Sequence, residues 1–194
     1  MLQPPQNPER RAFLAKGCAC GALILAGAPL VAADTKAPED WRLSFVKKRY
    51  ARLLEILSSR MDEKALKETL FALGTHCSGL SDENTKKFRG DLEGYRQMTK
   101  RNVSGDDITY DWEKGVITMA SGERTDCFCP LISRLYQKSA TACNCSLGWQ
   151  KHTWETLLQK KVEVDLKESV LRGDKRCVFE IRVLEPLPTT AAAS

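Results

Sequence analysis

The sequence predicts an α+β domain in which N-terminal helices pack on an antiparallel sheet, completed by a C-terminal helix and a β-hairpin. Between residues 41 and 95, apolar side chains recur at helical spacing. From residue 108 onward, short segments alternate apolar and polar residues, as half-buried strands do. Helical spacing returns once, over residues 148–158. We therefore expect helices first and strands later, in a single domain spanning residues 41–185.

The first 33 residues predict a twin-arginine signal peptide. Arg10 and Arg11 precede a Phe-Leu pair, and an apolar run over residues 17–33 ends in Val-Ala-Ala, a small-residue cleavage site. Glu9 stands where this pattern usually has Ser or Thr, and the lysine of the pattern comes one position late. The apolar run is short and interrupted by Gly and Pro, which is typical of a signal and not of a membrane span.

This signal predicts export through the twin-arginine translocase to a periplasmic or other extracytoplasmic location. After cleavage the protein is not expected to be an integral membrane protein. Residues 34–40 are predicted to form a linker, and residues 186–194, rich in Pro, Thr and Ala, a disordered tail.

Three helices are predicted before residue 102. The first spans residues 41–57, and the second begins after Asp62, a typical N-cap, and ends its apolar stripe at Cys77. The third opens at residue 81 or 82, and the glycines at positions 90 and 94 weaken it. It should place Phe88, Leu92 and Tyr95 toward the core.

The first helix carries a basic cluster of Lys47, Lys48, Arg49 and Arg52 opposite its apolar stripe. The whole chain has a formal net charge of +5 at pH 7. This mild charge and the helical placement indicate a solvated helix face, and we expect no nucleic-acid partner.

Two hairpins and one short strand are predicted in the second half. Residues 108–112 and 116–119 form the first hairpin, with its turn at Lys114-Gly115, and residues 125–129 form a short strand that Pro130 stops. The last hairpin pairs residues 162–166 with residues 177–183 around a turn at residues 172–175.

Six cysteines follow the signal, which itself holds two more. They are Cys77, Cys127, Cys129, Cys143, Cys145 and Cys177. The middle four form two C-x-C pairs in one short region. A disulfide inside a C-x-C pair closes a very small, strained ring. The two pairs are therefore predicted to act across to each other as one unit.

Four converging sulfurs allow several states. They can hold one tetrahedral metal ion, with Cys127, Cys129, Cys143 and Cys145 as ligands and Asn144 or Ser146 donating hydrogen bonds to sulfur. Zinc is favoured because four thiolates suit it, and an iron–sulfur cluster is the alternative. The alternative to a metal is two crossed disulfides, which an even cysteine count in an exported protein also allows and which would leave no cofactor. A reduced, reactive thiol group would require a low pKa.

Cys77 and Cys177 fall on apolar stripes and are expected to be small buried residues. Alternatively they meet each other, or one joins the cluster as an extra ligand or a nucleophile. His76 precedes Cys77 directly, and consecutive helix residues point apart, so a Cys–His dyad is not expected. His152 is expected to be a surface or packing residue, which leaves no basis for a histidine-based triad.

Several segments together resemble a known bacterial family. These are residues 143–149 (CNCSLGW), 162–166 (VEVDL), 169–174 (SVLRGD) and 177–181 (CVFEI), with residues 74–77 and 88–91 fitting more loosely. They are similar to the L-2-amino-thiazoline-4-carboxylic acid hydrolase-like family, and the ending is also similar to the 4-vinyl-reductase domain, a small-ligand module. The resemblance implies an α+β fold with a hydrophobic small-molecule pocket between helices and sheet. It carries no catalytic residues onto this chain.

These observations favour an exported binding or sensing domain that holds zinc at its cysteine loop and takes a small hydrophobic or sulfur-containing ligand. One alternative is a hydrolase of a small cyclic amide or thiazoline compound, with Cys77 as the attacking thiolate. A second alternative is a disulfide-stapled interaction domain. Four cysteine ligands argue against a catalytic zinc, which keeps one position open.

Overall fold

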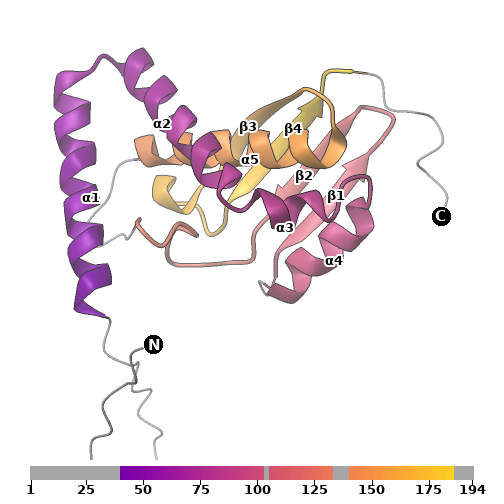
Figure 1. Cartoon of the computed structure of the whole chain (residues 1–194), viewed down its shortest axis with the longest axis horizontal. Coiled ribbons are helices and arrows are strands. Elements are labelled where there is room, and N and C mark those ends of the chain that lie inside the picture. Colours follow the sequence, from indigo (N-terminus) through magenta and orange to yellow (C-terminus); the bar gives the residue numbers. More distant parts are fainter. Residues whose placement is uncertain (1–39, 103–104, 133–139, 186–194) are drawn as a thin grey trace, which may run out of the picture. The chain divides into compact units, whose positions relative to one another are not determined.

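The fold joins a four-stranded antiparallel sheet to a set of helices, and helix α5 lies against both the sheet and helix α2 (Figure 1). The structure is a computed structural model that describes residues 40–102, 105–132 and 140–185. It confirms the predicted α+β class. The α-helices are α1 (Trp41–Arg60), α2 (Glu63–Gly79), α3 (Asp82–Lys86), α4 (Leu92–Asn102) and α5 (Cys143–Leu158). The predicted signal peptide and tail lie outside the described residues.

The sheet has the order β1-β2-β4-β3, and each neighbouring pair is antiparallel. Its strands are β1 (Asp107–Asp111), β2 (Val116–Ala120), β3 (Val162–Glu168) and β4 (Val178–Val183). Ile117 of β2 and Val164 of β3 are both paired with Ile181, so the two predicted hairpins meet along β4. The short 3-10 helix η2 (Ala140–Ala142) directly precedes α5, and a second one, η3 (Val170–Arg172), connects β3 to β4.

The first core fills the space between α5 and the sheet. Trp154 and Leu157 of α5 are fully buried against Ile117 and Ile181 of the strands. Tyr95 of α4 packs edge-on against Trp154, with ring centroids 5.9 Å apart. The space between α5 and the sheet is thus packed with side chains.

Helices α2 and α5 cross at two glycines. A Cβ atom on Gly74 would stand 1.8 Å from the carbonyl oxygen of Cys145, and one on Gly148 would stand 2.0 Å from that of Phe71. The absence of side chains lets the two backbones touch. A buried hydrogen bond of 2.9 Å between the hydroxyls of Ser78 and Thr153 joins the same helices. This crossing fixes the first turn of α5, where two of the cysteines lie.

The structure differs from the sequence prediction in the third helix. Gly90 has φ +76° and donates its N–H to the carbonyl of Leu157, at 3.2 Å, which divides the predicted helix into α3 and α4. Asp91 then accepts a hydrogen bond from the N–H of Gly94 and so caps the start of α4. Phe88, Leu92 and Tyr95 still pack on the first core, as predicted.

The strand predicted over residues 125–129 was wrong. The N–H groups of Ser121 and Arg124 bond to the carbonyls of Cys177 and Lys175, and the chain then leaves the sheet as a loop. An alternating sequence forms a strand only where a neighbouring strand accepts its backbone hydrogen bonds, and this segment has no such neighbour among the described residues. Pro130 also lacks an N–H to donate. Helix α5 begins at Cys143, five residues earlier than the predicted helix at residue 148.

Candidate functional site at the thiol cluster

The two C-x-C pairs are Cys127 with Cys129 and Cys143 with Cys145, and we call these four residues the thiol cluster. The first pair lies on the loop that follows β2, and the second lies in the first turn of α5. Cys127, Cys129 and Cys145 all pack on a second core at the α1–α2–α5 end of the domain. The buried members of this second core are Leu54, Leu66, Leu70, Ile132 and Ala142. The fold therefore brings both pairs to one region.

Cys143 is buried, and its Sγ lies 3.1 Å from the hydroxyl of Ser169, the residue that caps η3. Cys145 follows Asn144 in the first turn of α5. Its Sγ lies 3.7 Å from the hydroxyl of Tyr50 on α1. The polar contact of Tyr50 with sulfur is a feature that the sequence pattern did not indicate.

Burial raises the pKa of three thiols in the cluster, those of Cys127, Cys143 and Cys145. For Cys127 the pKa rises to about 11, mainly through burial, which outweighs the lowering effect of a hydrogen bond with the backbone of Cys129. The pKa of Cys143 is raised by burial, which outweighs the lowering effect of its bond to Ser169. The pKa of Cys145 is likewise raised by burial, against its bond to Tyr50. These three thiols are protonated at neutral pH, which disfavours a cluster of reactive thiolates.

The remaining cysteines lie at the edges of this region. Cys77 is half-buried on α2 and is near enough to Cys145 to raise that thiol's pKa. Among the described residues, no base makes a hydrogen bond with the Cys77 thiol, which a nucleophile would need. Cys177 packs on the first core, yet it also raises the pKa of Cys143.

All six cysteines in the described part of the chain are free thiols. Within residues 40–102, 105–132 and 140–185, no three His, Cys, Asp or Glu side chains are arranged so that they could hold one metal ion. The role of the thiol cluster as a set of metal ligands stays a prediction. Asn144 donates its side-chain amide to the carbonyl of Thr141, at 2.8 Å, and not to a sulfur.

His152 makes its hydrogen bond away from the thiol cluster. His152 Nε2 lies 3.0 Å from a carboxylate oxygen of Asp82, which links α5 to α3. This is the packing role that the sequence predicted.

A cavity of about 450 Å³ adjoins the second core, and we call it the side cavity. Its apolar wall is formed by Met61 and Leu66, and its charged groups are Glu63, Lys67 and Arg172. The complete lining is Ser58, Met61, Glu63, Leu66, Lys67, Ala140, Thr141, Asn144 and Arg172. Leu66 belongs to the core on which the thiols pack, and Asn144 lies between Cys143 and Cys145 in sequence, so the side cavity and the thiol cluster are neighbours.

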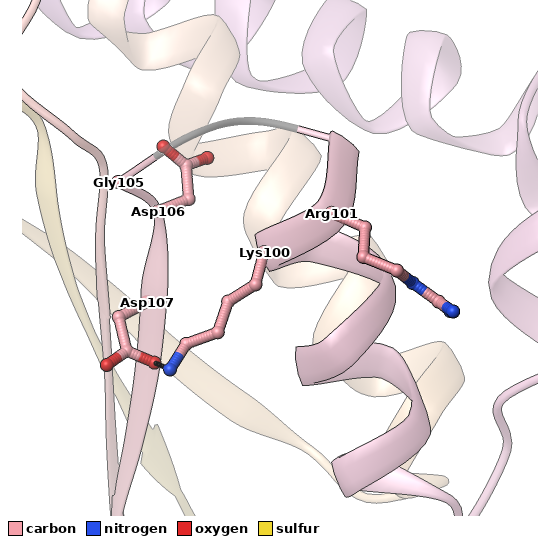
Figure 2. Close-up of a pocket in the computed structure, with 5 residues that line it drawn as sticks. All are labelled: Lys100, Arg101, Gly105, Asp106 and Asp107. Atoms are coloured by element: carbon pink, nitrogen blue, oxygen red, sulfur yellow. Dashed lines mark ion pairs between the residues drawn. The ribbon is translucent and has the colours of Figure 1, made fainter.

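A second cavity, of about 550 Å³, lies where α4 approaches β1 (Figure 2). Lys100 reaches across it to Asp107, with Nζ 3.0 Å from Oδ1, whereas Arg101 extends away. Asp106 accepts a hydrogen bond of 3.0 Å from the N–H of Gly122. Both acidic residues of this second cavity, Asp106 and Asp107, thus have partners within the protein. None of the described residues that line the cavity forms an apolar wall.

The fold and site define an α+β domain with a small cavity beside a group of thiols. Residues 105–187 match the model of a family of unknown function, DUF6144, which is less than half of the chain. The match includes both cysteine pairs and all four strands but not α1 or α2. No curated protein matches this chain.

Three solved structures are similar in fold. A trafficking protein particle complex subunit 3 from Naegleria fowleri, covalently bound to palmitic acid, has 16% identity and a TM-score of 0.47 over 75% of this chain and 99% of its own. The phenol-responsive sensory domain of the transcription activator PoxR, with phenol, has 16% identity and a TM-score of 0.44 over 71% and 74%. A vinyl-4-reductase family protein from Methanocaldococcus jannaschii has 14% identity and a TM-score of 0.33 over 77% and 99%. At these identities the likeness concerns the fold alone.

Proposed function

We propose that this chain is a binding or sensing domain that takes a small amphipathic ligand, apolar at one end and anionic at the other, in the side cavity. The observation that supports this most is the lining itself. Met61 and Leu66 offer an apolar wall that continues into the second core, and Arg172 offers a cation in the lining. The volume of about 450 Å³ lies in the range that small-molecule sites occupy.

The charges at this cavity favour an anion. Lys67 is paired with Glu63 at 2.5 Å, so those two lining charges offset each other. Arg172 donates to the carbonyl of Leu166, at 3.1 Å, and no acidic side chain in the described part of the chain forms an ion pair with it. A carboxylate near Arg172 would gain a charge-assisted hydrogen bond, and an alkyl or aryl body would lie along Leu66.

Thermal unfolding of the full chain with sodium octanoate as the probe tests this proposal. A ligand that binds only the folded state raises the midpoint of unfolding in proportion to the logarithm of its concentration. Arg172→Gln should abolish most of this rise. Arg176→Gln is the matched control, because Arg176 lies on the same connection, pairs with Glu168 and does not line the cavity. An octanoate effect that both variants retain, or no effect on the wild-type chain, would contradict the proposal.

A second candidate function is capture of a thiophilic metal ion, zinc first, by the thiol cluster. It is supported by the approach of both C-x-C pairs to one core. The sulfurs would have to close around the ion, because no ready-made group of three exists among the described residues. The raised thiol pKa values imply that binding would release protons.

Zinc titration of the reduced full chain against a chromophoric chelator separates this candidate from ligand binding alone. We expect one zinc per chain, lost in Cys145→Ser and retained in Cys177→Ser, whose cysteine packs on the other core. Circular dichroism should show that both variants remain folded. Equal retention, or equal loss, in the two variants would reject the thiol cluster as the zinc site.

Export also stays a proposal, supported by the paired arginines and the apolar run that follows them. In a bacterial host, Arg10→Lys together with Arg11→Lys should keep the full chain in the cytoplasm. Immunoblotting of periplasmic and cytoplasmic fractions measures this. A variant that reaches the periplasm as well as the wild type would show that the segment is not a twin-arginine signal.

A further inference from the structure

The outer face of α1 exposes an unusual amount of apolar surface. On this 20-residue helix only Ala51 and Leu54 are buried. Trp41 is 69% exposed and Phe45 49%, and further along the helix Leu53 is 48% exposed and Ile56 44%. At 100° per residue these four side chains fall within one sector, opposite the side that packs on the second core. Large apolar side chains therefore lie on two sides of the helix, and only those on the inner side are covered by the second core.

Basic residues lie within this same sector: at 100° per residue, Arg42, Arg49, Arg52 and Arg60 fall between Trp41 and Leu53, and Lys48 lies at its border. Five exposed cations lie on α1, at Arg42, Lys48, Arg49, Arg52 and Arg60. The helix contains a single acidic residue, Glu55. The guanidinium of Arg42 lies 5.7 Å from the ring centroid of Trp41, and that of Arg49 lies 5.1 Å from that of Phe45. Charge and aromatic surface thus occur together along the same side of the helix.

We propose that the outer face of α1 docks on an anionic phospholipid surface, with the helix lying in the plane of the interface. Interfacial helices likewise contain cations together with Trp, Phe and Leu, although their cations lie on a separate face. On α1 the two kinds of side chain share one face, where the long arginine side chains can reach anionic headgroups while the apolar side chains beside them enter the acyl boundary. Among the described helices, none is long and apolar enough to cross a membrane. A second copy of the chain fits less well, because two such faces would place like charges against each other.

This surface is separate from the side cavity, so the proposal does not depend on the proposed ligand. Docking also leaves the second core in place, since Ala51 and Leu54 lie on the other side of α1. Tyr50, which contacts Cys145, faces that core as well.

Flotation of the full chain with lipid vesicles tests the proposal. Vesicles of phosphatidylcholine alone are compared with vesicles containing about a quarter phosphatidylglycerol, at low and at physiological salt. We expect binding that requires phosphatidylglycerol and weakens with salt. Phe45→Ser with Ile56→Ser should weaken binding, and so should Arg42→Glu with Arg49→Glu. For the arginine pair the expected loss is at least about thirtyfold, since each basic residue near such a surface contributes about fivefold.

Lys114→Glu with Lys175→Glu is the control, because it makes the same change in net charge at exposed residues outside α1. It should retain binding, apart from a small general effect of charge. All variants keep residues 1–33, so any contribution of that segment is common to them. Sedimentation velocity measures self-association of the same proteins.

Three results would overturn the proposal. The first is no binding of the wild-type chain to phosphatidylglycerol vesicles at low salt. The second is binding that both α1 variants retain at wild-type strength. The third is a dimer that the α1 variants abolish while vesicle binding is unchanged, which would make a second copy the occupant of this face.

Discussion

Replacing Gly74 with alanine tests the glycine crossing on which the position of the thiol cluster depends. The new Cβ would stand 1.8 Å from the carbonyl oxygen of Cys145, whereas real Cβ contacts essentially never fall below 3.0 Å. The obstacle is helix backbone and cannot rotate away. Helices α2 and α5 must therefore separate by more than about 1 Å, which forfeits a quarter to a half of the dispersion attraction across the contact.

The magnitude follows from two opposing effects. Alanine is favoured over glycine in a helix interior by about 1 kcal/mol, whereas forcing an extra methyl into a packed contact costs about 1–3 kcal/mol or more. Because this contact meets backbone, we expect the cost at its upper end and a net loss of about 2 kcal/mol in the free energy of unfolding. For a chain of this size, that lowers the midpoint of thermal unfolding by about 4–8 °C.

Gly79→Ala is the matched control. Gly79 ends the same helix, and the nearest atom to its added Cβ is His152 Nε2 at 3.9 Å, an ordinary contact. Its midpoint should stay within about 2 °C of the wild type. Circular dichroism melts of the reduced proteins measure both variants. A Gly74→Ala variant as stable as Gly79→Ala would refute the close crossing of α2 and α5.

Two further predictions concern the contacts of α5. Thr153→Val should cost about 1–2 kcal/mol, because it leaves the buried Ser78 hydroxyl without its partner, and adding Ser78→Ala should restore part of the loss in urea unfolding. Asp82→Asn should cost about 0.5–1 kcal/mol at pH 7. Burial raises the pKa of Asp82, but its hydrogen bonds to His152 and Lys86 lower it by more, so the stabilisation is present above the ordinary aspartate pKa and is lost as the pH falls below it. Wild type and variant should therefore converge in stability below about pH 4, and a constant difference down to acid pH would contradict this assignment.

The sequence pattern predicted the elements whose periodicity is set by burial on one face. Strand β3 alternates between more and less buried side chains, and the register of the β3–β4 hairpin places Val164 opposite Ile181 in the core. Asp62 was predicted as an N-cap, and its carboxylate accepts from the N–H of Ala65 at 2.9 Å. Local signals sufficed here because the local preference and the tertiary packing agree.

The differences arose where a tertiary contact overrides the local pattern. Gly90 breaks the third helix because its N–H bonds to Leu157, a residue distant in sequence. Helix α5 includes Cys143 and Cys145 although neither favours helix, because its first turn is held against α2 at Gly74.

The C-x-C spacing indicated that Cys127, Cys129, Cys143 and Cys145 act as one unit, and this stays a prediction. The structure packs Cys127, Cys129 and Cys145 on the second core. Spacing carries no information on which surface borders that region, so the side cavity and Arg172 were not predicted. A basic residue in a turn looks like a solvated surface residue until the fold places it beside a cavity.

The most direct test of the proposed binding site is a map of where small probes bind on the full chain. Chemical-shift perturbation in two-dimensional NMR spectra, recorded with octanoate and with benzoate, provides such a map. We predict that shifts concentrate at Met61, Leu66, Asn144 and Arg172, around the side cavity. Shifts confined to the cavity at Lys100, or spread evenly over the protein, would contradict the account.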